Sequence, residues 1–256
     1  MKKIQTIVAC AAALVLVGVY NLKAADTAKI ATKATVRSIH GSVTYQTPSG
    51  AWEPLKINME LDAGVNIRTG ADSYTDLSIN GVTSVARITE NTMIAIPEMD
   101  RVGAGRDADT ETTLDLTTGT VLGNVKKLSA NSHYEIKTPH GVAGIRGTDW
   151  QVTVGLDGVT TFTSVQGQLI VSAVLNNVPV VKVLRDGESW TPGVGDVVPV
   201  PMNVLQQLIT DIGNIPKGPT APPPQPPPPS QTFPTGGSPT GSTGNPTPVV
   251  SPSGTP

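Results

Sequence analysis

Apolar and polar residues alternate in short runs through most of the chain between Thr35 and Val183. A period of two is typical of strands that bury one face and expose the other. The runs are also rich in Val, Ile and Thr, which favour strands over helices. The pattern predicts strands at residues 36–39, 42–46, 65–67, 74–79, 84–88, 114–116, 134–137, 150–154, 160–165 and 169–171.

Turn signals separate these runs. Asn80-Gly81, Asp157-Gly158 and Asp186-Gly187 can adopt the positive φ angles that tight hairpin turns require. Within this body no ten-residue stretch keeps a helical apolar period without a Gly or a Pro. We therefore predict an all-β fold over residues 34–200, a twisted body of short strands that is either solenoid-like or sandwich-like.

A weak internal recurrence divides the body. His40-Gly41-Ser42-Val43, Thr118-Gly119-Thr120-Val121 and Gln166-Gly167-Gln168-Leu169 each place a glycine two residues before an apolar strand residue. The separations differ, so the chain is not a fixed-period array. The recurrence predicts two related halves, at about 34–97 and 113–192. The polar segment 97–111 between them is expected to be an exposed connection.

A different pattern follows the β body. Val204, Leu205, Leu208, Ile209 and Ile212 recur at the spacing of one helical face, which predicts a short amphipathic helix over residues 201–213. We expect this helix to pack back onto the β body; the alternative is a helix that binds a partner or a second copy.

The C-terminal segment, residues 214–256, has an unusual composition. Fifteen of the 23 prolines lie at or after Pro216, and Lys217 is the only charged residue from there to the end. Such a segment buries too little apolar surface to fold, and its Pro-rich part favours polyproline II. We predict a disordered tail rich in Pro, Gly, Ser and Thr.

The N-terminus has the three parts of a secretory signal peptide. Lys2 and Lys3 precede an apolar run that ends in a polar stretch with small residues. We predict cleavage between Ala24 and Ala25, which makes 1–24 the signal peptide and 25–33 an N-terminal extension. The alternative is an uncleaved membrane anchor, although the apolar run is shorter than the roughly 20 residues that span a bilayer.

Charge and cysteine content narrow the function classes. The formal net charge is −2, so the chain shows no basic footprint for nucleic acid. The only cysteine is Cys10, inside the predicted signal peptide. Loss of that segment excludes disulfides and thiolate metal sites, and a lipidation site at Cys10 is disfavoured because the apolar run continues beyond it.

Several ordered motifs resemble those of the FecR domain. Thr138-Pro139 is followed by a small apolar stretch and then by Arg146-Gly147-Thr148-Asp149 with Trp150. The segments 61–70, 166–169 and 184–190 resemble other strands of the same family. The resemblance covers residues 34–192.

The resemblance implies an extracytoplasmic β domain with twisted packing of strands. In FecR regulators this domain senses an outer-membrane receptor, and a transmembrane helix and a cytoplasmic region pass the signal to a sigma factor. This sequence shows neither a cytoplasmic segment before its apolar run nor an α/β docking subdomain after the body. The resemblance is therefore closer to stand-alone secreted FecR-domain proteins.

Candidate sites have structural interpretations that we favour. Arg146, Gly147, Thr148 and Asp149 form either a recognition loop or a structural turn, in which Arg146 bonds backbone carbonyls of neighbouring strands. Trp150 and Trp190 are expected in the core, and Trp52 near a turn. His40, His133 and His140 have no spacing typical of metal ligands, and no nucleophile or phosphate-binding motif is present. We predict no catalytic, cofactor-binding or metal-binding residue.

The sequence therefore predicts a non-enzymatic binding or structural module, exported to the periplasm or the extracellular space. Its expected partner is an envelope protein or polymer, without nucleic acid and without a membrane span once the signal is cleaved. The first alternative is a membrane-anchored FecR-like regulator, and the second is a hydrolase of cell-envelope polymers.

Overall fold

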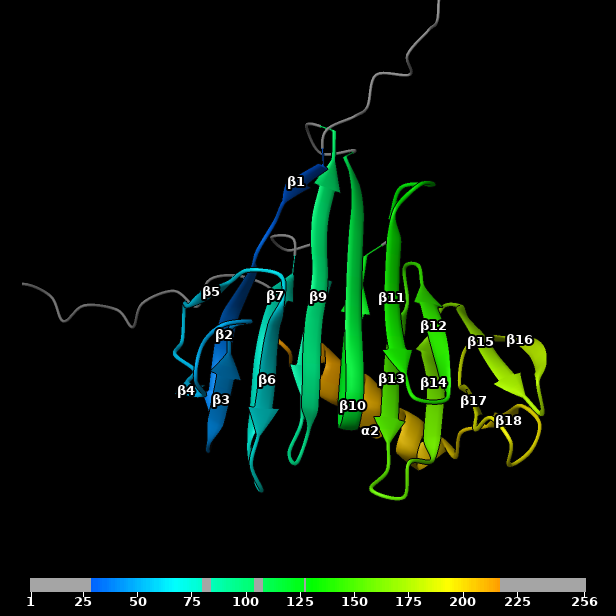
Figure 1. Ribbon diagram of the computed structural model, residues 1–256. Helices are drawn as coiled ribbons and strands as arrows, with labels where there is room; N and C mark the ends of the chain where they lie inside the picture. The colour runs from blue at the N-terminus through cyan, green and yellow to red at the C-terminus, as the bar shows by residue number, and fades with distance from the viewer. Residues whose placement is uncertain (1–28, 80–83, 104–107, 127, 217–256) are drawn as a thin grey trace, which may run out of the picture. The chain divides into compact units, whose positions relative to one another are not determined.

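The computed structural model describes residues 29–79, 84–103, 108–126 and 128–216. The predicted signal peptide with Ala24 and Ala25, the Asn80-Gly81 turn and the tail from residue 217 lie outside these residues. Within them the chain consists of short strands and one helix, α2 (Met202–Gly213), which confirms the predicted all-β fold (Figure 1). No helix in this part of the chain is long and apolar enough to cross a membrane.

The strands form two sheets that share one strand. Sheet A runs in the order β4 (Glu53–Pro54), β3 (Val43–Gln46), β6 (Val65–Thr69), β9 (Met93–Val102), β10 (Asp109–Val125), β11 (His133–Thr138), β12 (Gly141–Ile145), β15 (Leu169–Leu175) and β16 (Val178–Leu184). The short β1 (Lys29–Ala31) pairs with the end of β9. This strand belongs to residues 25–33, which the sequence analysis assigned to an N-terminal extension before the domain. All neighbours are antiparallel except β10 and β11.

In sheet B, strand β10 lies in the middle, with as many strands before it as after it. Its order is β5 (Glu60–Leu61), β2 (Ala34–His40), β7 (Tyr74–Ile79), β8 (Ser84–Ile88), β10, β13 (Asp149–Val154), β14 (Thr160–Gln166), β17 (Glu188–Trp190) and β18 (Val198–Pro199). Every pair in sheet B is antiparallel. The division into halves at 34–97 and 113–192 stays a prediction.

Strand β10 passes from one sheet to the other. Its first part pairs with β9 and β11 in sheet A, and its last part, from Gly119, pairs with β13 and β8 in sheet B. Gly119 has a φ of 96°, and a Cβ there would lie 2.5 Å from the Cα of Thr92. Only glycine combines this conformation with this close approach, so one residue permits the crossing on which both sheets depend.

The two sheets pack face to face around one hydrophobic core. Inward residues of both sheets form a single buried cluster, to which Ile67, Ile94 and Leu114 contribute from sheet A and Leu77, Trp150 and Phe162 from sheet B. The architecture is therefore sandwich-like. Trp150 and Trp190 are 0% and 1% exposed, which confirms their predicted place in the core.

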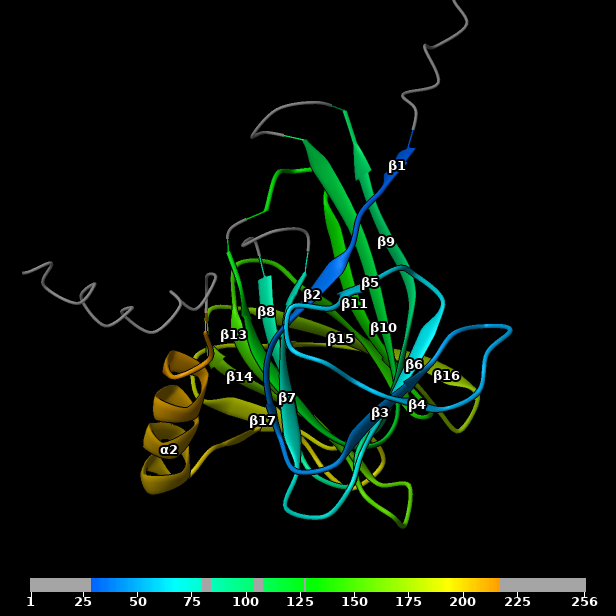
Figure 2. The same cartoon turned by 90° about the vertical axis from the view of Figure 1, so that its left-hand side faces the viewer.

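Helix α2 packs on the outer face of sheet B, as Figure 2 shows. Leu208 and Ile212 are buried together with Val85 of β8, Leu122 of β10 and Val165 of β14. The apolar helical face thus covers a second, smaller apolar cluster on the side of the sheet away from the main core. This confirms the expectation that the helix packs back onto the β body.

Three regions differ from the expectation drawn from the sequence: the segment 97–111 and the strands β12 and β16. The segment 97–111, predicted as an exposed connection, belongs for the most part to the long neighbouring strands β9 and β10. Strands β12 and β16 were not predicted at all. Each of β9 and β16 contains a proline, which argues locally against a strand. Pro97 lies at the register shift between β9 and β10, and Pro179 lies in a strand with one neighbour. Proline is compatible with a strand where its missing N–H is not needed by the ladder.

Candidate functional site

The outer face of sheet A carries a hollow over β11, β12 and β15. Its volume is about 320 Å³. We call it the Arg146 hollow, and it is lined by Ser132, His133, Tyr134, Glu135, Gly144, Ile145, Arg146, Gln168 and Ile170.

The strand register explains why these side chains meet. Pairing across sheet A aligns Glu135, Gly144, Ile170 and Val183 in one row over four strands. Arg146 follows the last residue of β12 and lines the hollow together with Gly144. Gly144, which has no side chain, therefore lies between the carboxylate of Glu135 on one side and the apolar residues Ile170 and Val183 on the other.

Gly144 forms the floor of the hollow. A Cβ at this position would meet only the carbonyl oxygen of Ile170, at 3.8 Å, an ordinary contact. By contrast, a Cβ at Gly123 of β10 would lie 2.2 Å from the carbonyl oxygen of Val85. Packing therefore requires glycine at Gly123 and does not require it at Gly144. Glycine inside a strand often marks a place where another molecule approaches the backbone.

Arg146 does not have the structural role that we expected from the sequence. Its side chain is exposed, and it forms no hydrogen bond or ion pair with the residues that the structure describes. Arg146 lies in the bend that follows β12, and no described backbone carbonyl accepts a hydrogen bond from it. The expectation that Arg146 ties strands together is corrected: its guanidinium stands free at the edge of the hollow.

The other three residues of the motif stabilise the turn. Gly147 has a φ of 68°, which favours glycine. Thr148 is buried and donates from Oγ1 to the carbonyl of Gln168 at 2.8 Å. Asp149 accepts a hydrogen bond from the side-chain amide of Asn124. These three residues thus hold the turn in place, and of the four only Arg146 lines the hollow.

The hollow has a firm base because Tyr134 below it is buried. Its ring packs near that of Trp150, with centroids 6.3 Å apart, and burial raises the pKa of its hydroxyl. His133 and Glu135 flank Tyr134 on the outward side of β11. The hollow therefore offers hydrogen-bond donors and acceptors on the outer face of sheet A.

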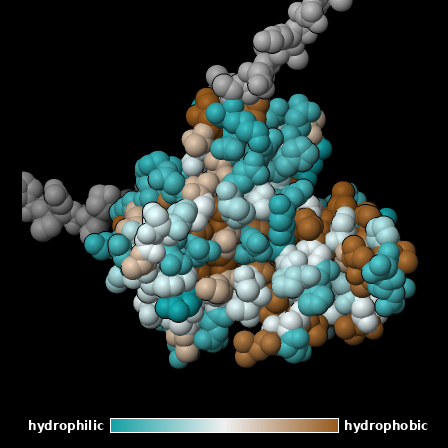
Figure 3. Space-filling view, viewed as in Figure 1, coloured by the Kyte–Doolittle hydropathy of each residue, from teal (hydrophilic) through white to brown (hydrophobic). Residues whose placement is uncertain are grey.

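Exposed apolar side chains extend from the hollow toward β16. Ile170 and Val174 of β15 are 47% and 68% exposed, and Val181 and Val183 of β16 are 61% and 39% exposed. Figure 3 shows hydrophobic surface on this side of the molecule, over β15 and β16. A connected exposed group of large apolar residues is typical of an interaction surface.

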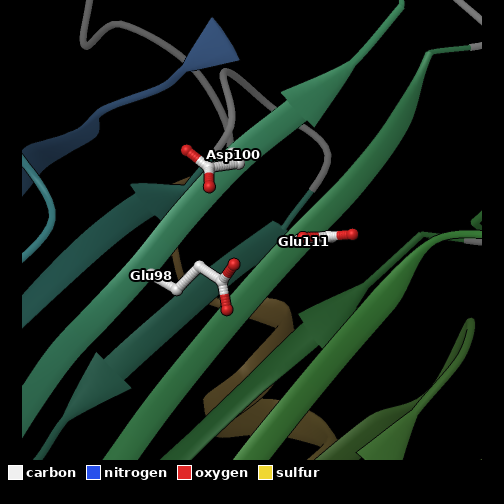
Figure 4. Close-up of side chains that lie close together, drawn as sticks. All are labelled: Glu98, Asp100 and Glu111. Carbon is white, nitrogen blue, oxygen red and sulfur yellow. The ribbon is translucent and has the colours of Figure 1, made fainter. Parts of the chain in front are cut away.

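A cluster of three carboxylates lies elsewhere on the same face. Glu98 and Asp100 project from β9 and Glu111 projects from β10 (Figure 4). The ammonium of Lys29 already binds two of them, Glu111 and Glu98, the latter at 3.1 Å. These contacts raise the pKa of Lys29, and the contact with Lys29 lowers the pKa of Glu111. The cluster is therefore an ion-pair network that joins β1 to β9 and β10.

The histidines lie in separate surroundings. His40 stacks on Tyr74 with centroids 5.3 Å apart, and Nδ1 of His140 lies 3.5 Å from Thr160. Within the described part of the chain, neither they nor His133 join two other potential ligands of a metal. Trp52 is half-buried beneath the guanidinium of Arg68, 4.7 Å from its ring centroid, a packing role at a turn.

Sequence reasoning identified Arg146 but missed the rest of the hollow. The roles of Gly144 and Ile170 could not be read from local sequence, because they depend on pairing of strands that are distant along the chain. The only available hint was a glycine inside a predicted apolar stretch.

Comparison with known proteins gives two similar crystal structures and one family match. Two crystal structures of a candidate anti-sigma factor from Parabacteroides distasonis ATCC 8503, at 1.65 and 2.50 Å resolution, are similar to this chain with 11% identity and a TM-score of 0.43 each. The similarity covers 56% of this chain and 64% and 63% of those chains, so it spans less than two thirds of their length. No curated protein matches the sequence.

The family comparison gives a match within the β body. The model of the family described as FecR protein matches residues 65–169, from the start of β6 to the start of β15. The matched segment includes Arg146 and the residues that form the turn beside it. Its place in the chain agrees with the motifs from which the resemblance was drawn, and residues 65–169 are therefore similar to the FecR domain.

Proposed function

We propose that this chain is a non-enzymatic binding module of the FecR type, which acts outside the cytoplasm and binds an envelope protein or polymer. The observation that carries the proposal is the Arg146 hollow. It combines a free guanidinium, a glycine floor that packing does not require and adjoining exposed apolar residues on one rigid face.

Binding suits this face better than a structural role does. A guanidinium offers five donors in a planar fork, which suits carboxylates and other planar acceptors. Exposed Ile170 supplies apolar contact next to it. Arg and buried apolar residues supply most of the binding energy in many interfaces, and the described face has both without an internal partner for Arg146.

The binding proposal is tested by capture of envelope proteins and polymers on the immobilised full chain. Arg146→Ala removes the fork, and Gly144→Val fills the floor of the hollow. We expect both variants to lose a partner that the wild-type chain retains, while the urea midpoint of neither variant falls. Lys56→Ala is the matched control, because Lys56 is an exposed cation in the β4–β5 connection.

Three outcomes would contradict this assignment. Equal capture by the wild type, Arg146→Ala and Gly144→Val would mean that the partner binds elsewhere. A lowered urea midpoint for Arg146→Ala would restore the structural interpretation of this residue. A turnover of envelope polymers by the purified chain would favour the hydrolase alternative.

Location outside the cytoplasm is tested separately by mass spectrometry of the protein from the envelope fraction. We expect the mature chain to begin at Ala25, since small Ala24 ends a three-part signal and Lys23 disfavours the next bond. A full-length chain retained in the membrane would support the membrane-anchored regulator instead.

A further inference from the structure

The edges of the two sheets are unequal. Five described strands have a neighbour on one side only, and four of them, β1, β4, β5 and β18, contain two or three residues. The fifth, β16, contains seven residues. Natural proteins limit unwanted pairing by keeping edge strands very short. β16 is therefore the edge at which this fold presents an extended row of unpaired backbone groups.

The backbone of β16 is regular and open. Its pairing with β15 runs from Val178 to Leu184 without a register shift, so no bulge twists the edge away. Among the described residues, its backbone forms hydrogen bonds with no strand other than β15. Lys182 could otherwise protect an edge, but Asp196 holds its ammonium at 2.6 Å.

Pro179 shows which amide groups face the open side. Proline is accommodated in an edge strand when its missing N–H faces away from the ladder. By the period of two, Val181 and Val183 then direct their N–H and C=O groups to the same open side. Their side chains lie on the outer face of sheet A and are exposed.

We propose that β16 pairs with β16 of a second copy of this chain, antiparallel and about a two-fold axis at Val181. This register opposes Val181 to its own counterpart, Pro179 to Val183, and Val180 to Lys182. The carbonyl of Pro179 accepts from the N–H of Val183, so the missing N–H of proline does not block the pairing.

Charge and shape favour a second copy as the occupant. β16 contains no carboxylate, and the proposed register sets no two like charges opposite each other, which would be unfavourable. The exposed valines of the two copies form one continuous apolar strip with Ile170 and Val174. Two-fold interfaces are self-complementary and are the commonest in soluble oligomers. The interface consists of one strand pair with its adjoining side chains, so we expect a dimer that dissociates on dilution.

The oligomeric state of the full chain tests the proposal directly. Light scattering coupled to gel filtration, over a concentration series, should show a dimer that gives way to monomer. Val181→Glu sets two carboxylates opposite each other at the axis and should leave only monomer with an unchanged melting temperature. Val204→Glu is the matched control, since Val204 is an exposed valine on α2 and should keep the dimer.

Cross-linking tests the register without relying on a charge. In a Cys10→Ser background, Val181→Cys should form an intermolecular disulfide about tenfold faster than Val204→Cys. A hydrogen-bonded antiparallel pair holds its Cα atoms ~5.5 Å apart, a separation that a disulfide bridges.

Four results would overturn the inference. The first is a monomer at every concentration, and the second is a dimer that survives Val181→Glu. The third is a Val181→Cys variant that cross-links no faster than the control. A different protein bound along β16 in place of the second copy would also contradict it, while the partner proposed for the Arg146 hollow would be unaffected.

Discussion

The two outer faces of the sandwich consist of similar strands, but they differ in whether their apolar residues are covered. On sheet B, α2 covers Val85, Leu122 and Val165, so that the apolar residues of that face are buried. On sheet A, Val174 and Val181 remain exposed. A helix thus closes one face, and nothing in the described part of the chain covers the other.

The arginines of the two sheets also differ in whether they have a partner within the fold. On sheet B, the carboxylate of Asp76 is 1% exposed and accepts from Nε of Arg87 at 2.7 Å and from its second guanidinium nitrogen at 2.9 Å. These contacts raise the pKa of Arg87. On sheet A, Arg146 has no such partner. One arginine is satisfied within the fold, and the other is left available for a ligand.

The largest expected effect belongs to the closed face. Arg87→Ala leaves the carboxylate of Asp76 buried without its countercharge, so the free energy of unfolding should fall by about 3–5 kcal/mol. Urea unfolding measures this change. Arg87→Lys should recover only part of it, because an ammonium does not reproduce the two parallel hydrogen bonds. A loss as small as that of an exposed residue would show that water reaches Asp76.

The second prediction concerns the contribution of helix α2, packed on sheet B, to the free energy of unfolding. Ile212 is 1% exposed, and Ile212→Ala should lower the free energy of unfolding by about 2–4 kcal/mol through lost burial and a cavity. Ile209 on the same helix is 48% exposed, and Ile209→Ala should change it by less than about 0.5 kcal/mol. Equal effects of the two variants in thermal unfolding would contradict the observed orientation of the helix.

The smallest effect is expected on the open face and has the opposite sign. Gly144→Ala should raise the free energy of unfolding by about 0.4–1 kcal/mol, because alanine restricts the unfolded chain and its Cβ meets no obstacle. Gly123→Ala is the contrasting variant, since its Cβ would collide with the backbone of β8. If Gly144→Ala destabilises the protein, the glycine serves packing and is not a floor kept open for a ligand.

The strands of the body could be predicted because their signals are local. The ranges 74–79 and 84–88 coincide with β7 and β8, and the helix predicted over 201–213 is observed as α2, Met202–Gly213. Strand β16 escaped prediction because Pro179 interrupts its apolar run, and only the sheet shows that this proline lies at an edge. The free side chain of Arg146 was also unpredictable, because its outward direction depends on the register of β12 against β11 and β15.

The sequence by itself determined the all-β class, the place of the helix and the FecR resemblance, since alternation, helical spacing and short motifs are properties of neighbouring residues. Tertiary structure alone decided that β10 belongs to both sheets, that α2 covers sheet B, and that Gly144 and Ile170 meet beside Arg146. These features depend on which distant strands pair and in which register. A period of two defines two faces of a strand, but it does not specify what lies against each face.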